Sequence, residues 1–406
     1  MNNLTRRAAL TGLAVAPLAR PGIIRAQSTS QPVRILMISD LNGPYRDVGG
    51  PGQKVGCDLA VEDFGGSVLD RKIEVIQVDG QNKPNIAGAL AREWIDAHGA
   101  NVLTDGAATS SGLAMQTISK EKKVIYLITG PASTNFTQKL CTPYGFHWTY
   151  DTYAMAKGTG GKLTQAGGDT WFFITADYAF GTSLQTNTEE FVKKAGGKIL
   201  GSVRAPLGTA DFSSYLVQAR ASGAKVIGFA NAGDDLVNCL KQASEFGIAK
   251  GGQKMATLLM FITNVAAVGQ DICEGLVLTN SFYWNLNDKT RAWTKRYVAK
   301  MNSPPTMLHA GQYSATLAWL KAVKAAGTVD GDAVSAKLHA TPVNDFYDDN
   351  VAIQPNGRVA EKMYVWQVKP ASESKEKWDF YKPIGTMSGE ESTMPMAETG
   401  CPLVHA

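Results

Sequence analysis

The stretch Val33-Arg34-Ile35-Leu36-Met37-Ile38 decides the fold, because a short apolar run rich in β-branched residues predicts a buried strand. The residues that follow alternate between helical and strand-like patterns. We predict helices at 50–64, 85–97 and 111–120, and strands at 72–78, 102–103 and 124–128. This alternation is typical of a parallel sheet that helices cover on both faces.

The same alternation restarts near residue 150. We predict helices at 152–165, 183–195, 212–221 and 234–246, and strands at 171–174, 199–203, 226–230 and 257–261. A third region follows, with strands at 276–278 and 363–368, helices at 289–301 and 311–326, and a polar tail. The short join at 148–151 contains no Gly/Ser linker, which indicates a hinge between two α/β lobes and not a flexible tether.

Composition and charge describe an ordinary globular protein. The chain has 406 residues, of which 44% are hydrophobic and 19% charged, and two domains are expected at this length. The formal charge of +4 comes from residues 1–26, which hold four arginines and no acid; the other 36 basic residues balance 36 acidic ones. A neutral body argues against nucleic-acid binding, which needs clustered positive charge.

Residues 1–26 are predicted to be an export signal. Paired Arg6 and Arg7 precede a weakly apolar run at 8–16, which is far too short to span a bilayer. The pair is typical of a twin-arginine signal, although Ala9 stands where a bulky apolar residue is usual; a Sec signal is the alternative. We expect cleavage near Ala26 and a mature protein in the periplasm with no membrane insertion.

The five cysteines form no C-x-x-C motif and have no histidine at metal-ligand spacing. Cys57 and Cys239 lie in helix-like stretches and are expected to be buried. Cys141 and Cys401 lie in loops that contain proline, and in an oxidising compartment they could pair and fix the C-terminal tail. This pairing is a hypothesis at the level of the sequence.

The sequence contains no complete motif of a nucleotide-binding or catalytic site. Gly50 and Gly52 suggest a dinucleotide motif, but Val55 occupies the position of its third glycine. Gly160-Gly161-Lys162 suggests a phosphate loop, but Leu163 replaces the required Ser or Thr. The five histidines are single and far apart in the sequence. We therefore predict no enzyme activity, no cofactor and no metal.

Two predicted strand-to-helix turns are rich in small and hydroxyl residues. They are 105–112, after the third strand, and 129–135, after the fourth. Both lie at the carboxyl edge of a parallel sheet, where ligands bind, and free N–H groups at a helix start can hold a carboxylate together with Ser and Thr hydroxyls. Plain helix capping by these hydroxyls is the alternative for either turn alone.

The chain resembles the extracytoplasmic solute-binding proteins of ABC importers, in the branched-chain amino-acid-binding (type I) group. The resemblance spans most of the chain after the signal and rests on several motifs: 41–50 (LNGPYRDVGG), 60–66 (AVEDFGG), 73–79, 177–181 (DYAFG), 211–214 (DFSS) and 274–276 (EGL). It implies two doubly wound parallel-sheet lobes joined by a three-crossing hinge. The lobes implied are 32–150 with 280–357, and 151–279 with 358–406.

The resemblance also implies a ligand site. Its first-lobe anion clamp corresponds to Ser110, Ser111, Ser133 and Thr134, and Tyr45 corresponds to the loop after the first strand. In the second lobe the resemblance implies an aromatic contact near Tyr178 and Phe180. The turn at 230–235, with Asn231 and Asp234, is expected to face the cleft.

The sequence departs from the family at one position that matters for the ligand. Amino-acid binders of this group carry an acid after the strand at 257–261 that holds the ligand ammonium, but residues 261–264 are Phe-Ile-Thr-Asn. An unpaired buried ammonium is costly, so aromatic acids compete with amino acids as ligands, unless Asp234 or Asp235 substitutes. We expect a monomer that captures a small carboxylate for an inner-membrane ABC permease. A sensor domain, or less favourably an enzyme acting on the solute, is the alternative.

Overall fold

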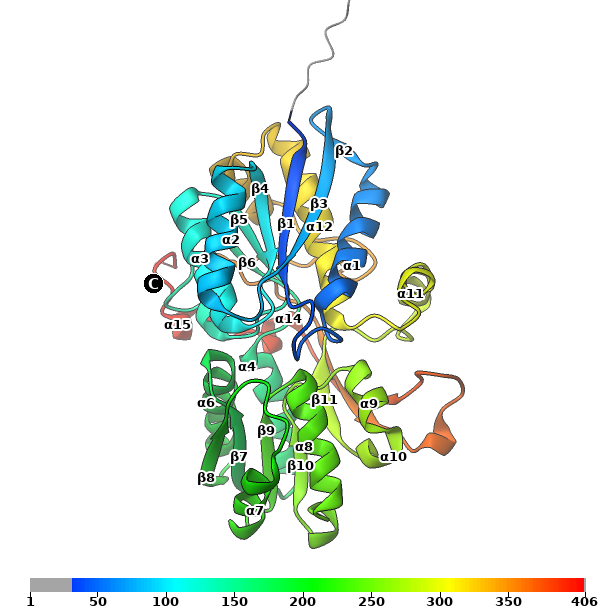
Figure 1. The fold of residues 1–406 in the computed structure, drawn as a ribbon. Helices are drawn as coiled ribbons and strands as arrows, with labels where there is room; N and C mark the ends of the chain where they lie inside the picture. Colours follow the sequence, from blue (N-terminus) through cyan, green and yellow to red (C-terminus); the bar gives the residue numbers. More distant parts are fainter. Residues whose placement is uncertain (1–30, 405–406) are drawn as a thin grey trace, which may run out of the picture. The chain divides into compact units, whose positions relative to one another are not determined.

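The computed structural model describes residues 31–404 (Figure 1). The export signal predicted at 1–26 lies outside the described residues. Two parallel sheets, each covered by helices, form two lobes, which confirms the α/β class. Among the described residues, no helix is long and apolar enough to cross a lipid bilayer.

The first lobe is built on a six-stranded sheet in the order β2-β3-β1-β4-β5-β6, parallel except for the β2–β3 pair. Its strands are β1 (Val33–Ser39), β2 (Ser67–Val68), β3 (Arg71–Asp79), β4 (Ala100–Asp105), β5 (Ile125–Ile128) and β6 (Gly145–His147). Its helices are α1 (Gly50–Phe64), α2 (Pro84–Asp96) and α3 (Thr109–Lys122), followed by the 3-10 turn η1 (Thr134–Phe136).

Strand β1 is apolar from Ile35 to Ile38 because alternate residues of this stretch are buried on opposite faces of the sheet. Ile35 and Met37 pack with Cys57 of α1 and with a helix from later in the chain. Leu36 and Ile38 pack on the other face, against α2 and α3. Both faces of the sheet are therefore covered, which is the condition that a continuous apolar strand predicts.

The second lobe is built on an all-parallel four-stranded sheet in the order β10-β9-β7-β8. Its strands are β7 (Thr170–Ala176), β8 (Lys198–Ala205), β9 (Val226–Ala230) and β10 (Lys254–Thr257). Its helices are α4 (Thr152–Met155), α5 (Lys162–Gln165), α6 (Ala179–Lys194), α7 (Ser213–Ala221), α8 (Gly233–Glu245), α9 (Ile262–Val268) and α10 (Gln270–Cys273), with the 3-10 turn η3 (Ala249–Gly251) between α8 and β10.

Two predictions in this lobe need correction. The strand predicted at 257–261 ends at Thr257, so Leu258–Phe261 form an irregular segment that leads into α9. The helix predicted at 152–165 is interrupted by a π-helical segment, η2 (Ala156–Gly161). Gly158 in this segment lies so close to Thr279 that a Cβ there would be under 3.0 Å from its side chain, so the wider turn fits against β11 (Val277–Asn280).

The last third of the chain joins both lobes. Strand β11 pairs antiparallel with β12 (Met363–Val368), which pairs antiparallel with β13 (Tyr381–Met387). The other elements are α11 (Asp288–Met301), α12 (Met307–Ala326), α13 (Gly331–Ala340), η4 (Ala371–Glu373), α14 (Gly389–Ser392) and α15 (Met396–Thr399). Helix α12 packs on α1 of the first lobe, and the polar tail predicted after 368 instead contains β13 and two short helices.

Segments 147–151 and 358–361 run side by side where the chain passes between the lobes. His147 and Arg358 form an isolated parallel bridge. The Arg358 guanidinium lies 3.2 Å from the Asp151 carboxylate, and both side chains are buried. The Thr149 N–H donates to Glu361 Oε1 at 3.0 Å. The hinge is thus held by buried polar contacts, while the lobe boundaries at 150, 280 and 358 stay predictions.

A disulfide joins Cys141, between η1 and β6, to Cys401 in the C-terminal tail, with the two Cα atoms 5.7 Å apart. The other three cysteines, Cys57, Cys239 and Cys273, are free and buried. The tail leaves the sheet of β11–β13 and returns to the first lobe, where Gln138 Nε2 donates to Met394 Sδ at 2.9 Å. The disulfide therefore fixes the C-terminal tail to the first lobe.

Replacing both cysteines, Cys141→Ser with Cys401→Ser, should lower the free energy of unfolding by about 2–5 kcal/mol, because the cross-link restricts the unfolded chain. Urea denaturation followed by circular dichroism measures this change. Wild-type protein unfolded in the presence of a reductant serves as the control and should match the double variant. Equal stability of the oxidised wild type and the double variant would contradict the expectation.

Candidate functional site

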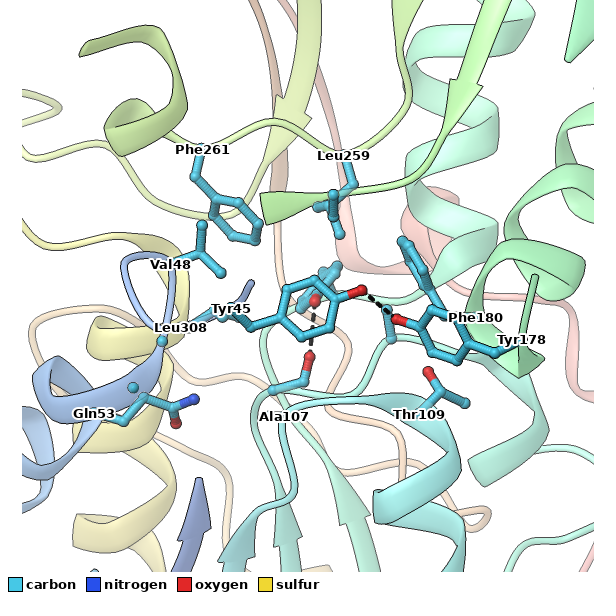
Figure 2. A pocket seen from close by; sticks show the side chains of 16 residues that line it. Tyr45, Val48, Gln53, Ala107, Thr109, Tyr178, Phe180, Leu259, Phe261 and Leu308 are labelled. Atoms are coloured by element: carbon cyan, nitrogen blue, oxygen red, sulfur yellow. Dashed lines mark hydrogen bonds between the residues drawn. The ribbon is translucent and has the colours of Figure 1, made fainter. Parts of the chain in front are cut away.

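A cavity lies where the carboxyl ends of the first-lobe strands meet the turns of the second lobe (Figure 2). The space between its lining atoms amounts to about 410 Å³, and part of that space is open to solvent. The lining residues come from both lobes and are Tyr45, Val48, Gly49, Gly50, Gln53, Ala107, Thr109, Gly130, Ala132, Tyr150, Tyr178, Phe180, Ala232, Leu259, Phe261 and Leu308. None of these lining residues carries a charged side chain, so the cavity is neutral.

The first turn of α3 supplies the polar side of the cavity. The N-cap residue Ala108 has no side chain that could satisfy the first N–H groups of the helix. Thr109 Oγ1 and Ser111 Oγ, in the same turn, are buried without a hydrogen-bond partner among the described residues. Helix N-termini attract negative charge, so this turn offers several unused polar groups to an anion.

The loop before α3 has a backbone that few residues adopt. Asp105, Gly106 and Ala107 have φ values of 69°, 103° and 41°. Asp105 Oδ1 accepts hydrogen bonds from the Ala107 N–H at 3.0 Å and from Gln53 Nε2 at 2.9 Å. Burial raises the pKa of Asp105 to about 6. The Asp105 carboxyl group thus stabilises the loop conformation that places the first turn of α3 at the cavity.

Three tyrosines line the middle of the cavity, and Figure 2 shows two of them, Tyr45 and Tyr178, between the α3 turn on one side and Phe261 and Leu259 on the other. The hydroxyls of Tyr45 and Tyr178 hydrogen-bond to each other, although 133 residues separate them in sequence. The Tyr150 hydroxyl donates to the Gly130 carbonyl at 2.8 Å. Burial raises the pKa of Tyr45 and of Tyr178, so both phenols stay neutral at physiological pH.

Backbone contacts also close the two lobes on each other. The Asp234 N–H donates to the Pro44 carbonyl at 3.0 Å. Gly233, the preceding residue, has a φ of 62°, and a Cβ built there would lie under 3.0 Å from both the Pro44 carbonyl oxygen and the Tyr45 ring. The close approach of the lobes thus requires a glycine at the start of α8.

Comparison with known proteins matches this geometry to a family. The sequence profile of the periplasmic binding protein family matches residues 32–376. The chain belongs to the periplasmic binding protein family. A periplasmic binding protein of Burkholderia mallei is 47% identical, with a TM-score of 0.90, and the alignment covers 92% of this chain and 99% of that one.

Other members of the family are more distant. A branched-chain amino-acid ABC transporter periplasmic ligand-binding protein of Burkholderia xenovorans is 34% identical, with a TM-score of 0.81 over 91% of this chain and 99% of that chain. The Leu/Ile/Val-binding protein homolog 6 of Brucella melitensis is 25% identical over 249 residues, or 61% of this chain; the match spans 62% of that relative's length, under two thirds. These likenesses identify the fold as the type I periplasmic binding protein fold.

One structural neighbour was solved with an aromatic acid. A solute-binding protein of an ABC transporter of Rhodopseudomonas palustris, solved with benzoate, has a TM-score of 0.80 over 91% of this chain and 99% of that chain. At 18% identity this likeness shows the fold alone.

Three of the predicted site residues of this periplasmic binding protein, Tyr45, Tyr178 and Phe180, line the cavity. Ser110 and Ser111 lie in the first turn of α3 beside it. The remaining four do not line the cavity. Ser133 accepts a hydrogen bond from the Asn135 N–H at 3.2 Å, Thr134 contacts Ser183 and Asn187, Asn231 Nδ2 donates to Cys239 Sγ, and Asp234 is exposed. The ligand contacts of all nine residues stay predictions.

Sequence reasoning missed several lining residues. Thr109 and Gly130 lie within the two hydroxyl-rich turns, so the sequence pattern could have predicted that they line the cavity. Gln53 of α1, Leu259 and Phe261 before α9, and Leu308 of α12 come from distant segments. No local pattern in the sequence places these four residues at one cavity.

Gly233→Ala should disfavour closure, because the new Cβ would overlap Pro44. We expect at least a tenfold loss of affinity for a bound solute, measured by calorimetry, and a larger radius of gyration by small-angle scattering. Gly247→Ala is the matched control, because Gly247 has a similar φ of 65° but no atom within 4 Å of the added Cβ. Identical affinities of the two variants would show that this contact plays no part in closure.

Proposed function

We propose that this protein captures a small apolar or aromatic monocarboxylate and presents it to an ABC importer by closing its two lobes. The observation that carries the proposal is that one uncharged cavity has a polar end and an apolar end. The uncapped first turn of α3 lies at one end, and Leu259 and Phe261 lie at the other. A small molecule with one anionic group and an apolar body would match the chemistry of both ends.

The carboxylate end supplies hydrogen bonds without a cation. The N–H groups of the first turn of α3 and the Thr109 and Ser111 hydroxyls have no partner within the helix or among the described side chains. Hydrogen bonds from such groups to a charged acceptor contribute about 1.5–3 kcal/mol each. Because these groups are hydrogen-bond donors at a helix N-terminus, the arrangement favours a negatively charged group over a positively charged one.

The lack of an acid in the lining argues against an amino acid as the ligand. A bound ammonium group needs a negative partner, because burying it unpaired costs several kcal/mol. Asn264 stands in the region where an acid would be needed, and its side chain accepts from the Phe261 N–H at 2.9 Å as part of the cap of α9. Asp235 accepts from the Gly208 N–H at 3.1 Å, and neither Asp234 nor Asp235 lines the cavity.

Capture proceeds by closure of the lobes about the hinge. The ligand first meets the first lobe, at α3 and the Tyr45 loop, and closure then adds Tyr178, Phe180 and Phe261 from the second lobe. A ligand that contacts both lobes binds the closed state more tightly and shifts the population toward it. The closed form is the one we propose for recognition by an inner-membrane permease.

A thermal-shift screen tests this function. Benzoate and 4-hydroxybenzoate should raise the melting temperature, because a ligand at 100 times its dissociation constant adds about 2.7 kcal/mol of stability. Benzamide, which keeps the ring of benzoate and lacks its charge, is the matched control and should not stabilise the protein. A larger shift with leucine would overturn the ligand class, and no shift with any carboxylate would overturn the function.

Thr109→Val should weaken binding of a stabilising carboxylate by about 1–3 kcal/mol, because it removes an unpartnered hydroxyl at the anion end and nearly preserves the volume. Calorimetry measures the change. Ser133→Ala is the comparison, since the Ser133 hydroxyl already accepts from the Asn135 N–H. A larger loss of affinity in Ser133→Ala than in Thr109→Val would place the anion at the other turn.

A further inference from the structure

The carboxyl group of Asp105 lies directly behind the anion end of the cavity. Asp105 Oδ1 accepts the Ala107 N–H at 3.0 Å, and Ala107 lines the cavity beside Thr109 (Figure 2). Gly130 also lines the cavity, and a Cβ placed on it would lie under 3.0 Å from the same Oδ1. The carboxyl group therefore lies directly behind the part of the cavity wall that Ala107 and Gly130 form.

No cation neutralises Asp105 among the described residues. The groups that face it are Gln53 of α1, the Ser39 hydroxyl and the Asp40 carboxylate at the end of β1, the Tyr126 hydroxyl of β5, and the Tyr150 phenol. Its side chain is fully buried, and no group meets its Oδ2 in full hydrogen-bond geometry, although the nearby Ser39 hydroxyl lowers the pKa of Asp105 and so opposes the effect of burial. A buried ionised oxygen without a partner is costly, whereas a protonated one is neutral.

We propose that Asp105 takes up a proton when an anion binds at the first turn of α3, so that capture of a carboxylate is coupled to proton uptake. The proposal rests on the proposed function. The proton comes from the solvent and forms an O–H bond on the Asp105 carboxylate, and no other bond changes. The physical cause is repulsion between two negative charges that the cavity wall brings together in a buried environment.

The sign of the pH dependence follows from this coupling. Burial raises the pKa of Asp105 to about 6, so the ligand-free protein is largely ionised there at pH 7 and largely protonated at pH 5. A bound anion raises this pKa further. Between the two pKa values, affinity falls as pH rises, by up to about tenfold per pH unit, because each binding event must take up a proton. Below both values, affinity is independent of Asp105.

Calorimetry with benzoate as the probe tests the coupling. Titrations in buffers of different ionisation enthalpy give the number of protons taken up for each benzoate bound. The wild type should take up a proton at pH 7 and little at pH 5. No uptake by the wild type at pH 7 would overturn the proposal.

Asp105→Asn supplies the decisive variant. Asparagine tolerates the φ of 69° at this position, and its side-chain oxygen can still accept from Ala107 and Gln53. This variant should bind benzoate with a pH-independent affinity and, at pH 8, more tightly than the wild type. Asp211→Asn removes an exposed carboxylate and should behave like the wild type. Uptake that persists unchanged in Asp105→Asn would overturn the proposal.

A measurement without ligand separates this proposal from the proposed function. Carbon-13 NMR of protein labelled at aspartate carboxyls, assigned with the Asp105→Asn variant, gives the pKa of Asp105 directly. A value near 6 in the ligand-free protein supports the proposal, and a value near 4 overturns it whether or not benzoate binds. Failure of both proteins to bind benzoate, with the pKa near 6, counts against the ligand class and not against the buried proton.

Discussion

Helix α3 begins without a side chain to satisfy its first N–H groups, and the design of the cavity follows from this start. Buried backbone donors need partners, and under the proposed function the bound solute supplies them. The surrounding residues add hydroxyls and aromatic rings and no charge. Under the proposed function, selectivity for a carboxylate would come from the orientation of backbone dipoles and not from a counter-ion, and the uncharged lining would accommodate an apolar ligand body.

The loop that precedes α3 contains a carboxyl group with two opposing effects on the binding of an anion. Asp105 holds the left-handed turn by accepting from Ala107, and its burial places a second acid next to the position where an anion is expected. The second lobe adds a geometric condition of a different kind, since Gly233 lets the α8 turn meet the Pro44 carbonyl. Under the proposed function, binding would depend on the placement of the backbone as well as on the chemistry of the side chains that line the cavity.

Much of the fold could be predicted because periodicity reflects burial directly. Strand β1 is apolar on both faces since helices cover both, and α1 runs over the range that its pattern indicates. Strand β13 was missed because Pro383 and Gly385 interrupt a mostly exposed edge strand. Of the site, the turns after β4 and β5 were within reach, whereas Leu308 and Phe261 reach the cavity only through tertiary packing that no local pattern encodes.

The bond between Cys141 and Cys401 closes a ring across 260 residues of sequence, and most of the first lobe's later elements and the entire second lobe belong to that ring. A single nick in any loop inside it leaves the fragments tied together. Engineered breaks, such as new termini placed in an exposed loop of the second lobe, would consequently yield one covalent molecule as long as the sulfurs remain oxidised.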